Sequence, residues 1–202
     1  MRALLFDLDG VLVDSFAVWH AVLDAFARER GYPRISLREM EASWGQGVDA
    51  DARGFFPGTS VAELEAFYND RFLDHLEHLE VTSGVAGIFA ALRVGGIPTA
   101  VVTNTPAPLA KALLRRAEAE PDVLVGGTDV PRPKPAPDMV LRACELLFVA
   151  PAESAVVGDS EYDRRSASAA GTMFIGFRRA GDRRIDELGE LPGLLGLEPP
   201  TV

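Results

Sequence analysis

The sequence predicts an α/β fold in which a mainly parallel sheet carries helices on both faces and is joined to an inserted, all-helical cap. Short apolar runs of strand length alternate with segments of helical spacing over residues 82–202. Residues 15–81 interrupt this alternation, because they contain several helical patterns and no convincing strand. We therefore predict a Rossmann-like core formed by residues 1–14 and 82–202, with residues 15–81 as the cap.

Five apolar runs are the predicted strands of this sheet. Strands of a parallel sheet are covered on both faces, so they are apolar throughout rather than alternating. In such sheets, ligands bind where the carboxyl ends of the strands open into loops, and several of these runs end at polar residues. The runs are residues 3–6, 97–102, 123–125, 155–157 and 172–176.

Helical spacing fills the intervals between the predicted strands and most of the predicted cap. Two cap helices begin with a serine followed three residues later by a glutamate, which predicts a capping box at each start. Glycine and proline mark the breaks between cap helices. The core helices are predicted at residues 85–92, 107–117, 137–147 and 162–170, the capping boxes at Ser36 with Glu39 and Ser60 with Glu63, and the breaks at 44–47 and 57–59.

The composition limits the class of partner and the compartment. The formal net charge of −10 repels polyanions, so we expect no nucleic-acid partner. The one cysteine, Cys144, lies in a helical pattern and is expected to be a buried thiol. The first apolar run reaches Asp7 too soon for a signal peptide or a membrane span, so we expect no membrane association and a cytoplasmic protein.

Two carboxylates follow the first predicted strand. Asp7 and Asp9 are two residues apart, so both can project the same way while Leu8 points toward the core. Gly10 then allows a tight turn. An Asp-Gly pair is also common in ordinary turns. Two acids leaving an apolar strand are, however, costly to desolvate unless a cation or a reaction uses them.

A second acidic cluster follows the fourth predicted strand. Asp159 and Ser160 lie at the strand end, and Asp163 falls in the first turn of the next helix, where an acid could also be a simple cap. If both clusters lie on one edge of a parallel sheet, three or four carboxylates converge there. Such a set of oxygen ligands is what a hard divalent cation such as Mg²⁺ requires.

Donors suited to a phosphoryl group occur at two further positions. Thr103 and Asn104 close the second predicted strand, and Lys134 follows a proline-rich loop. Thr103 could be an ordinary turn residue and Lys134 a solvated one. The chain nevertheless uses arginine at eighteen of its twenty basic positions, so a lysine between prolines suggests a need for a compact point charge. Lys111, the other lysine, is expected at the surface.

These four clusters, in this order, resemble the four motifs of the haloacid dehalogenase superfamily over nearly the whole chain, and the cap resembles that of its phosphoglycolate phosphatase and β-phosphoglucomutase-like subfamily. The matching segments are Phe6 to Ser15, Val101 to Asn104, Lys134-Pro135, and Val157 to Asp163. The resemblance implies a magnesium-dependent phosphatase, a phosphoric monoester hydrolase, that acts on a small phosphorylated metabolite.

The resemblance also implies a role for each matching residue. Asp7 is the implied nucleophile, which forms an aspartyl-phosphate, and Asp9 is the acid and base. The implied magnesium ligands are Asp7, Asp9 through its carbonyl, and Asp159, with Asp163 supporting them. Thr103 and Lys134 complete the implied catalytic set, and the expected substrate-binding residues are Asn104, Gly10, Ser160 and Gln46.

The residues present argue against some of the other activities of the superfamily. A dehalogenase lacks the second aspartate, and a phosphonatase needs a cap lysine, of which this chain has none. A sugar phosphomutase shares every core motif and stays as the alternative, and a non-catalytic binding protein on the same fold is a more distant one. The sequence predicts neither the substrate nor the oligomeric state.

Two further groups of residues carry expectations about their position. The candidates to line a cap pocket are Gln46, Arg53, His20 and Tyr68, and the residues expected in solvent are Arg178, Arg179, Arg183 and Arg184.

Overall fold

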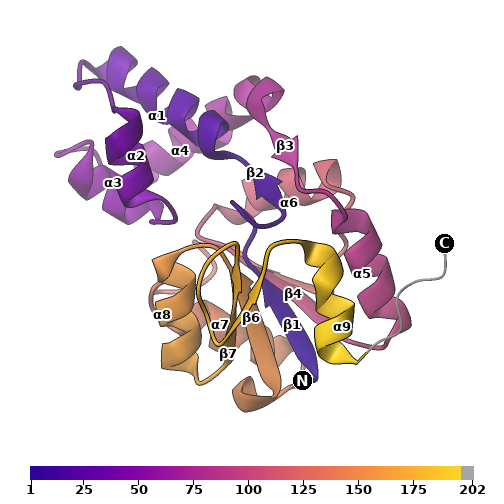
Figure 1. The fold of residues 1–202 in the computed structure, drawn as a ribbon. Coiled ribbons are helices and arrows are strands. Elements are labelled where there is room, and N and C mark those ends of the chain that lie inside the picture. The colour runs from indigo at the N-terminus through magenta and orange to yellow at the C-terminus, as the bar shows by residue number, and fades with distance from the viewer. Residues whose placement is uncertain (197–202) are drawn as a thin grey trace.

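The computed structural model describes residues 1–196. They form a sheet covered by helices on both faces and a separate group of helices beyond the carboxyl ends of the strands (Figure 1). All neighbouring strands of the six-stranded sheet are parallel. In spatial order they are β5 (Val123–Val125), β4 (Thr99–Val102), β1 (Ala3–Phe6), β6 (Ser154–Gly158), β7 (Met173–Phe177) and β8 (Arg183–Ile185). The predicted fold class is confirmed, although residues 197–202 of the predicted core lie outside the described residues.

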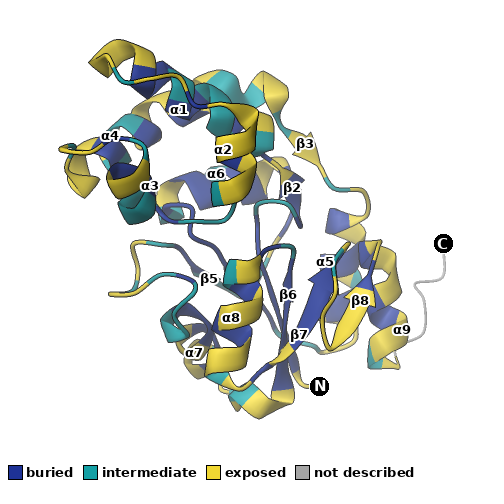
Figure 2. Ribbon diagram, turned by 60° about the vertical axis from the view of Figure 1, so that its left-hand side comes forward, coloured by how far each residue is buried: buried dark blue, intermediate teal, exposed yellow. Residues whose placement is uncertain are grey.

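Alternate residues of β1 face the two helical layers. Leu4 and Phe6 belong to a cluster of buried side chains that includes residues of α5 (Val85–Val94), α6 (Ala107–Arg116) and α9 (Leu191–Leu195). Ala3 and Leu5 belong to a second cluster, which includes residues of α7 (Asp138–Leu146) and α8 (Glu161–Ala170). Both faces of the strand are therefore buried, as Figure 2 shows for the inner strands. The core also contains two short 3₁₀ helices, η2 (Pro151–Glu153) and η3 (Leu188–Glu190).

Residues 15–81, the predicted cap, form a helical group that packs around aromatic side chains. Trp19 contacts Tyr68 and Phe72 with ring centroids 5.1 and 4.6 Å apart, and Phe26 meets Phe56 at 4.7 Å. This packing fixes Trp19 on the side of the first cap helix that faces the core. The elements are α1 (Phe16–Arg30), α2 (Leu37–Ser43), α3 (Val48–Gly54), α4 (Val61–Arg71) and the 3₁₀ helix η1 (Phe72–His78).

Two details of the cap differ from the sequence-based expectations. The cap stretch does contain a strand, because β3 (Glu80–Val81) pairs antiparallel with β2 (Val13–Asp14) where the chain leaves and re-enters the core. Ser60 accepts from the Glu63 amide, but the Glu63 side chain pairs with Arg30 at 3.0 Å instead of completing a capping box. The predicted box at Ser36 is complete.

The edge strand β8 was also missed. Its sequence, Arg183-Arg184-Ile185, has two exposed arginines, and only Ile185 is buried. A charged strand of this kind contains no apolar run, so the sequence pattern did not predict it. Its charges discourage pairing with other chains at the edge of the sheet. Cys144 is buried and Lys111 is exposed, as expected.

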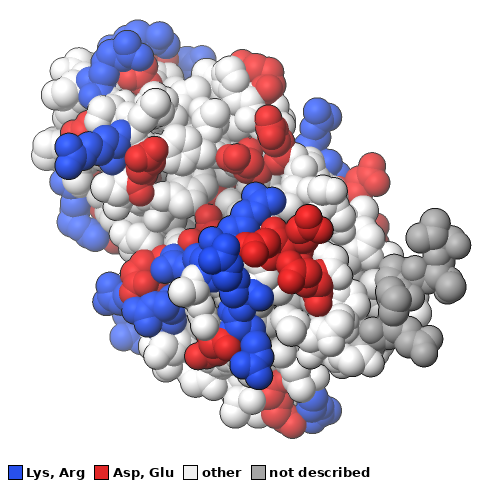
Figure 3. Space-filling view, in the orientation of Figure 1, with Lys and Arg blue, Asp and Glu red and all other residues white. Residues whose placement is uncertain are grey.

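No helix among residues 1–196 combines the length and the apolar character needed to cross a membrane. On the face shown in Figure 3, basic side chains form a band across the core with acidic side chains beside it. Ion pairs between arginine and acidic residues account for part of this mixing, including Arg164 with Glu161 and Arg184 with Asp186.

Candidate active site

The strand order brings three of the predicted motifs together. β1 lies between β4 and β6, with Phe6 level with both Val101 and Val157. Asp7, Thr103 and Asp159 each follow the last residues of one of these strands, so they meet at one edge of the sheet. This is the edge at which parallel α/β sheets bind ligands.

Lys134 connects two carboxylates at the centre of this edge. Its Nζ lies 2.8 Å from Asp7 Oδ1 and 2.6 Å from Asp163 Oδ1, and all three side chains are almost fully buried. The Leu8 amide also donates to Asp7 Oδ1, at 2.7 Å. Lys134 is therefore not the solvated lysine that its proline-rich loop also allowed.

The charges of this group are unbalanced. Burial and the neighbouring Asp163 carboxylate raise the pKa of Asp7 well above its ordinary value. Burial acts to lower the pKa of Lys134, but the Asp163 and Asp7 carboxylates outweigh it and raise that pKa. Burial opposes ionisation of Asp163, yet Lys134 and Ser160 hold its pKa below the ordinary value. The Lys134 ammonium is thus shared by two buried carboxylates, and a third carboxylate, that of Asp159, lies beside them.

Asp159 has the environment of a cation ligand. One oxygen each from Asp7, Asp159 and Asp163 lie within 4.8 Å of one another. Asp159 Oδ1 is buried and has no hydrogen-bond partner among residues 1–196. Burial, followed by the Asp163 charge, raises the pKa of Asp159 to about 7. Carboxylates placed this closely, with one oxygen left unpaired, fit a bound divalent cation.

Asp9 is held by four donors. Its Oδ1 accepts hydrogen bonds from the Ser15 hydroxyl and from Trp19 Nε1, the latter at 3.1 Å. Its Oδ2 accepts from Thr103 Oγ1 at 3.2 Å and from Thr105 Oγ1 at 2.7 Å. Three of these donors had no predicted role. Ser15 ends the first matched segment but was not assigned to the site, Trp19 looks like a core residue of a helix, and Thr105 lies one residue beyond the second matched segment.

Several polar groups of the predicted substrate-binding residues in the core form hydrogen bonds within the protein. Asn104 Nδ2 donates to the carbonyls of Gly45 and Lys134, at 2.8 and 3.0 Å, and its Oδ1 accepts from the Lys134 amide. The Ser160 hydroxyl bonds to Asp163 in the capping box that begins α8. The Gly10 amide donates to the Val13 carbonyl at 2.7 Å. Their direct contact with substrate stays a prediction.

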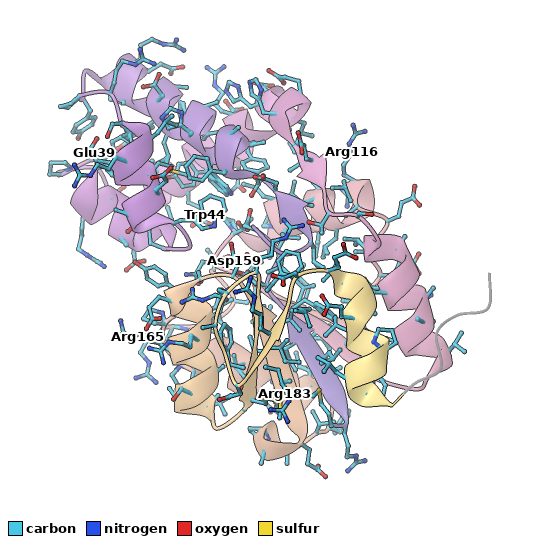
Figure 4. The ribbon with its side chains drawn as sticks, in the orientation of Figure 1. Glu39, Trp44, Arg116, Asp159, Arg165 and Arg183 are labelled. Atoms are coloured by element: carbon cyan, nitrogen blue, oxygen red, sulfur yellow. The ribbon has the colours of Figure 1, made fainter. Side chains whose placement is uncertain are left out.

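The cap meets the core through the loop of residues 44–47. Trp44 Nε1 donates to Asp159 Oδ2 at 3.2 Å, and Figure 4 shows the two residues facing each other across the junction. The Gly45 carbonyl accepts from Asn104, as above. Gln46 donates to Asp51 Oδ1 at 2.6 Å, within the cap. The break predicted at residues 44–47 is therefore a loop that contacts the core beside the acidic cluster.

A cavity of about 50 Å³ lies between this loop and the strand ends. Its walls combine the core site with aromatic and apolar residues of the cap. The lining residues are Asp7, Asp9, Trp19, Leu23, Met40, Ser43, Trp44, Gly45, Gln46, Val48, Asp51, Tyr68, Thr103, Asn104, Thr105, Pro106 and Lys134.

Not all of the suggested cap residues reach this cavity. Gln46 and Tyr68 line it, whereas Arg53 pairs with Asp49 at 2.9 Å with most of its side chain exposed. His20 bonds to the Ile35 carbonyl at 2.8 Å.

Arg179 departs from the expectation of a solvated residue. Its Nη1 donates to the Asp159 carbonyl at 2.9 Å, and its side chain is only 28% exposed. Arg178, Arg183 and Arg184 are exposed, as expected. A pair of neighbouring arginines gives no signal in the sequence that one of them turns toward the site.

Comparison with known proteins agrees with this geometry. The family model described as haloacid dehalogenase-like hydrolase matches residues 4–177. A phosphoglycolate phosphatase from Xanthomonas campestris is 32% identical over all of this chain and 94% of its own length. Hexitol phosphatase A from Escherichia coli is 33% identical over 93% of this chain and 88% of its own.

Solved structures give the same result. CbbY from Rhodobacter sphaeroides superposes with a TM-score of 0.84 at 26% identity, covering 98% of this chain and 99% of that one. It has been solved with phosphate and, as a mutant, with xylulose-1,5-bisphosphate.

The fold and the acidic strand ends therefore define a hydrolase with a Rossmann-like core. The chain belongs to the haloacid dehalogenase-like hydrolase family. The family and the enzyme class inferred from the four motifs, a phosphatase of the haloacid dehalogenase type, are confirmed.

Proposed function

We propose that the protein is a magnesium-dependent phosphatase that hydrolyses a small phosphorylated metabolite, of the phosphoglycolate or sugar-phosphate type, through an aspartyl-phosphate on Asp7. The observation that carries this proposal is the position of Lys134, whose buried ammonium lies between Asp7 and Asp163 at the ends of the strands. A carboxylate nucleophile and a phosphate repel each other, so attack requires cationic charge beside both. Lys134 supplies part of that charge.

Asp7 is held for attack by its neighbours. Oδ1 accepts from the Leu8 amide and from Lys134, which fixes the carboxylate group, and no hydrogen bond to Oδ2 occurs within residues 1–196. In the proposed first step, a carboxylate oxygen of Asp7 forms a bond to phosphorus. The bond from phosphorus to the ester oxygen breaks, and the alcohol leaves.

Asp9 handles the proton in both steps. It first gives a proton to the leaving ester oxygen and then takes one from the water that attacks the aspartyl-phosphate, which releases phosphate and regenerates Asp7. Two of the four donors that hold Asp9, Ser15 and Trp19, belong to the cap segment. Packing of the cap against the core therefore orients the proposed acid and base.

The oxygen atoms available for Mg²⁺ belong to Asp7, Asp159 and Asp163, with the Asp9 carbonyl as the ligand implied by the family resemblance. Asp163 is also bound to Lys134 and Ser160, so it supports the cluster more than it ligates. When bound, Mg²⁺ neutralises charge on the transferring phosphoryl group. The proposed donors to the phosphoryl oxygens are the backbone amide of Asn104, Lys134, and the Thr103 hydroxyl, which donates to Asp9 Oδ2 when no substrate is bound.

Release of phosphate from p-nitrophenyl phosphate tests this proposal. We expect activity with Mg²⁺, loss of activity in EDTA and recovery when Mg²⁺ is added in excess. Asp7→Asn is expected to abolish turnover without changing the circular dichroism spectrum. Full activity in EDTA, or turnover by Asp7→Asn at the wild-type rate, would contradict the proposal.

A further inference from the structure

The cap places a buried carboxylate in the wall of the active-site cavity. Asp51, on α3, is 8% exposed and lines the same cavity as Asp7 and Lys134. It is not part of any of the four motifs and has no place in the proposed phosphoryl transfer. Burying a carboxylate costs free energy of desolvation, which hydrogen-bond donors can offset.

Two donors hold the Asp51 carboxylate in place. Gln46 Nε2 donates to Oδ1 at 2.6 Å, and the Tyr68 hydroxyl donates to Oδ2 at 2.8 Å. A carboxylate oxygen has two lone pairs, so each oxygen can accept one more hydrogen bond. Burial raises the pKa of Asp51 to about 6, with the two donors opposing the rise, so the group is mostly ionised above neutral pH.

Among residues 1–196, the cap contributes no basic side chain to the cavity wall that could balance this charge. Its lining residues from the cap are aromatic, apolar or uncharged polar residues, with Asp51 as the one charged side chain among them. Lys134 is the one basic residue in the lining that the described part of the chain provides, and it is already bonded to Asp7 and Asp163. A second anionic group on a substrate would therefore meet a carboxylate without a compensating partner.

We propose that Asp51 selects phosphate monoesters whose remote end carries a hydroxyl or amino group and rejects those whose remote end is a carboxylate or a second phosphate. A hydroxyl or ammonium group donates to the free lone pairs of Asp51, whereas an anionic group is repelled by this buried carboxylate. This inference rests on the proposed phosphatase function. Within that function it favours polyol or sugar phosphates over phosphoglycolate.

Matched substrates test the inference on the wild-type enzyme. Phosphoglycolate and 2-hydroxyethyl phosphate differ only in whether a carboxylate or a hydroxymethyl group ends the molecule. The same holds for 3-phosphoglycerate and glycerol 3-phosphate. With Mg²⁺ at pH 8, we expect kcat/KM to be at least about tenfold higher for the hydroxyl member of one or both pairs, which corresponds to ~1.4 kcal/mol. Acetyl phosphate, which lacks a remote polar end, gives the basal rate.

Two variants assign the selectivity to Asp51. Asp51→Asn removes the charge at nearly constant shape, and we expect it to lower the hydroxyl-to-carboxylate ratio about tenfold. Asp49→Asn is the control, because Asp49 lies on the same helix but pairs with Arg53 and does not line the cavity. It should leave the ratio unchanged.

The outcomes separate the inference from the function on which it rests. Turnover of acetyl phosphate together with a wild-type preference for the carboxylate substrates, or an unchanged ratio in Asp51→Asn, would overturn the inference and leave the phosphatase proposal intact. If none of these phosphates showed Mg²⁺-dependent turnover, both the inference and the phosphatase proposal would be overturned. The wild-type comparison needs no variant, so it decides the question even if Asp51→Asn fails to fold.

Discussion

Gly10 and Asp159 are packed so closely that no side chain fits between them. A Cβ atom on Gly10 would lie 1.9 Å from Asp159 Oδ2, and the backbone of Gly10 has a φ of +82°. The glycine therefore allows the first acidic strand end to approach the second. From the sequence we expected a tight turn and a substrate-binding residue at Gly10, whereas the structure shows that the missing side chain makes room for a proposed metal ligand.

Gly10→Ala is expected to displace Asp159 and weaken Mg²⁺ binding. The displacement follows from the clash, because either the backbone or the carboxylate must move. We expect the Mg²⁺ concentration for half-maximal activity to rise about tenfold or more, equivalent to ~1.4 kcal/mol. The rise in Tm that excess Mg²⁺ gives the wild-type protein should shrink correspondingly.

Gly31→Ala is the matched control for this variant. Gly31 also has a positive φ, +73°, but nothing lies within 4 Å of an added Cβ. It should lose about 1 kcal/mol of stability from backbone strain and bind Mg²⁺ normally. Equal Mg²⁺ dependence in the two alanine variants would show that the clash with Asp159 does not matter.

Lys134→Met is expected to destabilise the fold as well as abolish activity. The substitution leaves the buried Asp7 and Asp163 carboxylates without their shared cation, and breaking a buried ion pair in this way costs about 3 to 5 kcal/mol. Urea unfolding in EDTA at pH 8 measures the loss. The control is Lys111→Met, the other lysine of the chain, which is exposed and should change the free energy of unfolding by less than about 0.5 kcal/mol. A similar small change in Lys134→Met would contradict the described ion pairs.

Asp51 should make the stability of the protein depend on pH. Its pKa is about 6 in the folded state against an ordinary value of 3.8, so the folded state binds the proton more tightly than the unfolded state. The contribution of Asp51 to stability is therefore greatest at low pH and is lost as pH rises from about 4 through 6.

This contribution is measured as a difference between two proteins. The free energy of unfolding of Asp51→Asn minus that of the wild type should increase by about 2 kcal/mol between pH 4.5 and pH 8, since one pKa unit corresponds to ~1.4 kcal/mol. The other titrating groups are common to both proteins and cancel. A difference that is constant with pH, or that decreases, would contradict the raised pKa.

The core of the site was predictable because its residues are tied to strand ends. An apolar run such as Ala3 to Phe6 predicts a strand, and the order of a parallel sheet places Asp7, Thr103 and Asp159 at the same edge. These contacts follow from secondary structure and topology. They do not require knowledge of how individual helices are rotated.

The cap contacts were not predictable for the opposite reason. Asp49 and Asp51 lie two residues apart in α3, and nothing in Val48 to Gly54 indicates which of them turns inward. That choice is set by packing against Tyr68 and Gln46 from other parts of the cap. Trp19 and Arg179 were missed similarly, because their contacts with Asp9 and Asp159 depend on tertiary packing.

The central claim, that Asp7 is the nucleophile and Asp9 the acid and base, is tested most directly by the reaction of Asp9→Asn with p-nitrophenyl phosphate. p-Nitrophenolate leaves without much protonation, so attack by Asp7 should survive, whereas hydrolysis of the intermediate loses its base. We expect a burst of p-nitrophenolate equal to the enzyme concentration, followed by a very slow steady state. Mass spectrometry after rapid acid quench should find one phosphoryl group on Asp7. Phosphate on another residue, or wild-type turnover by Asp9→Asn, would contradict the assignment.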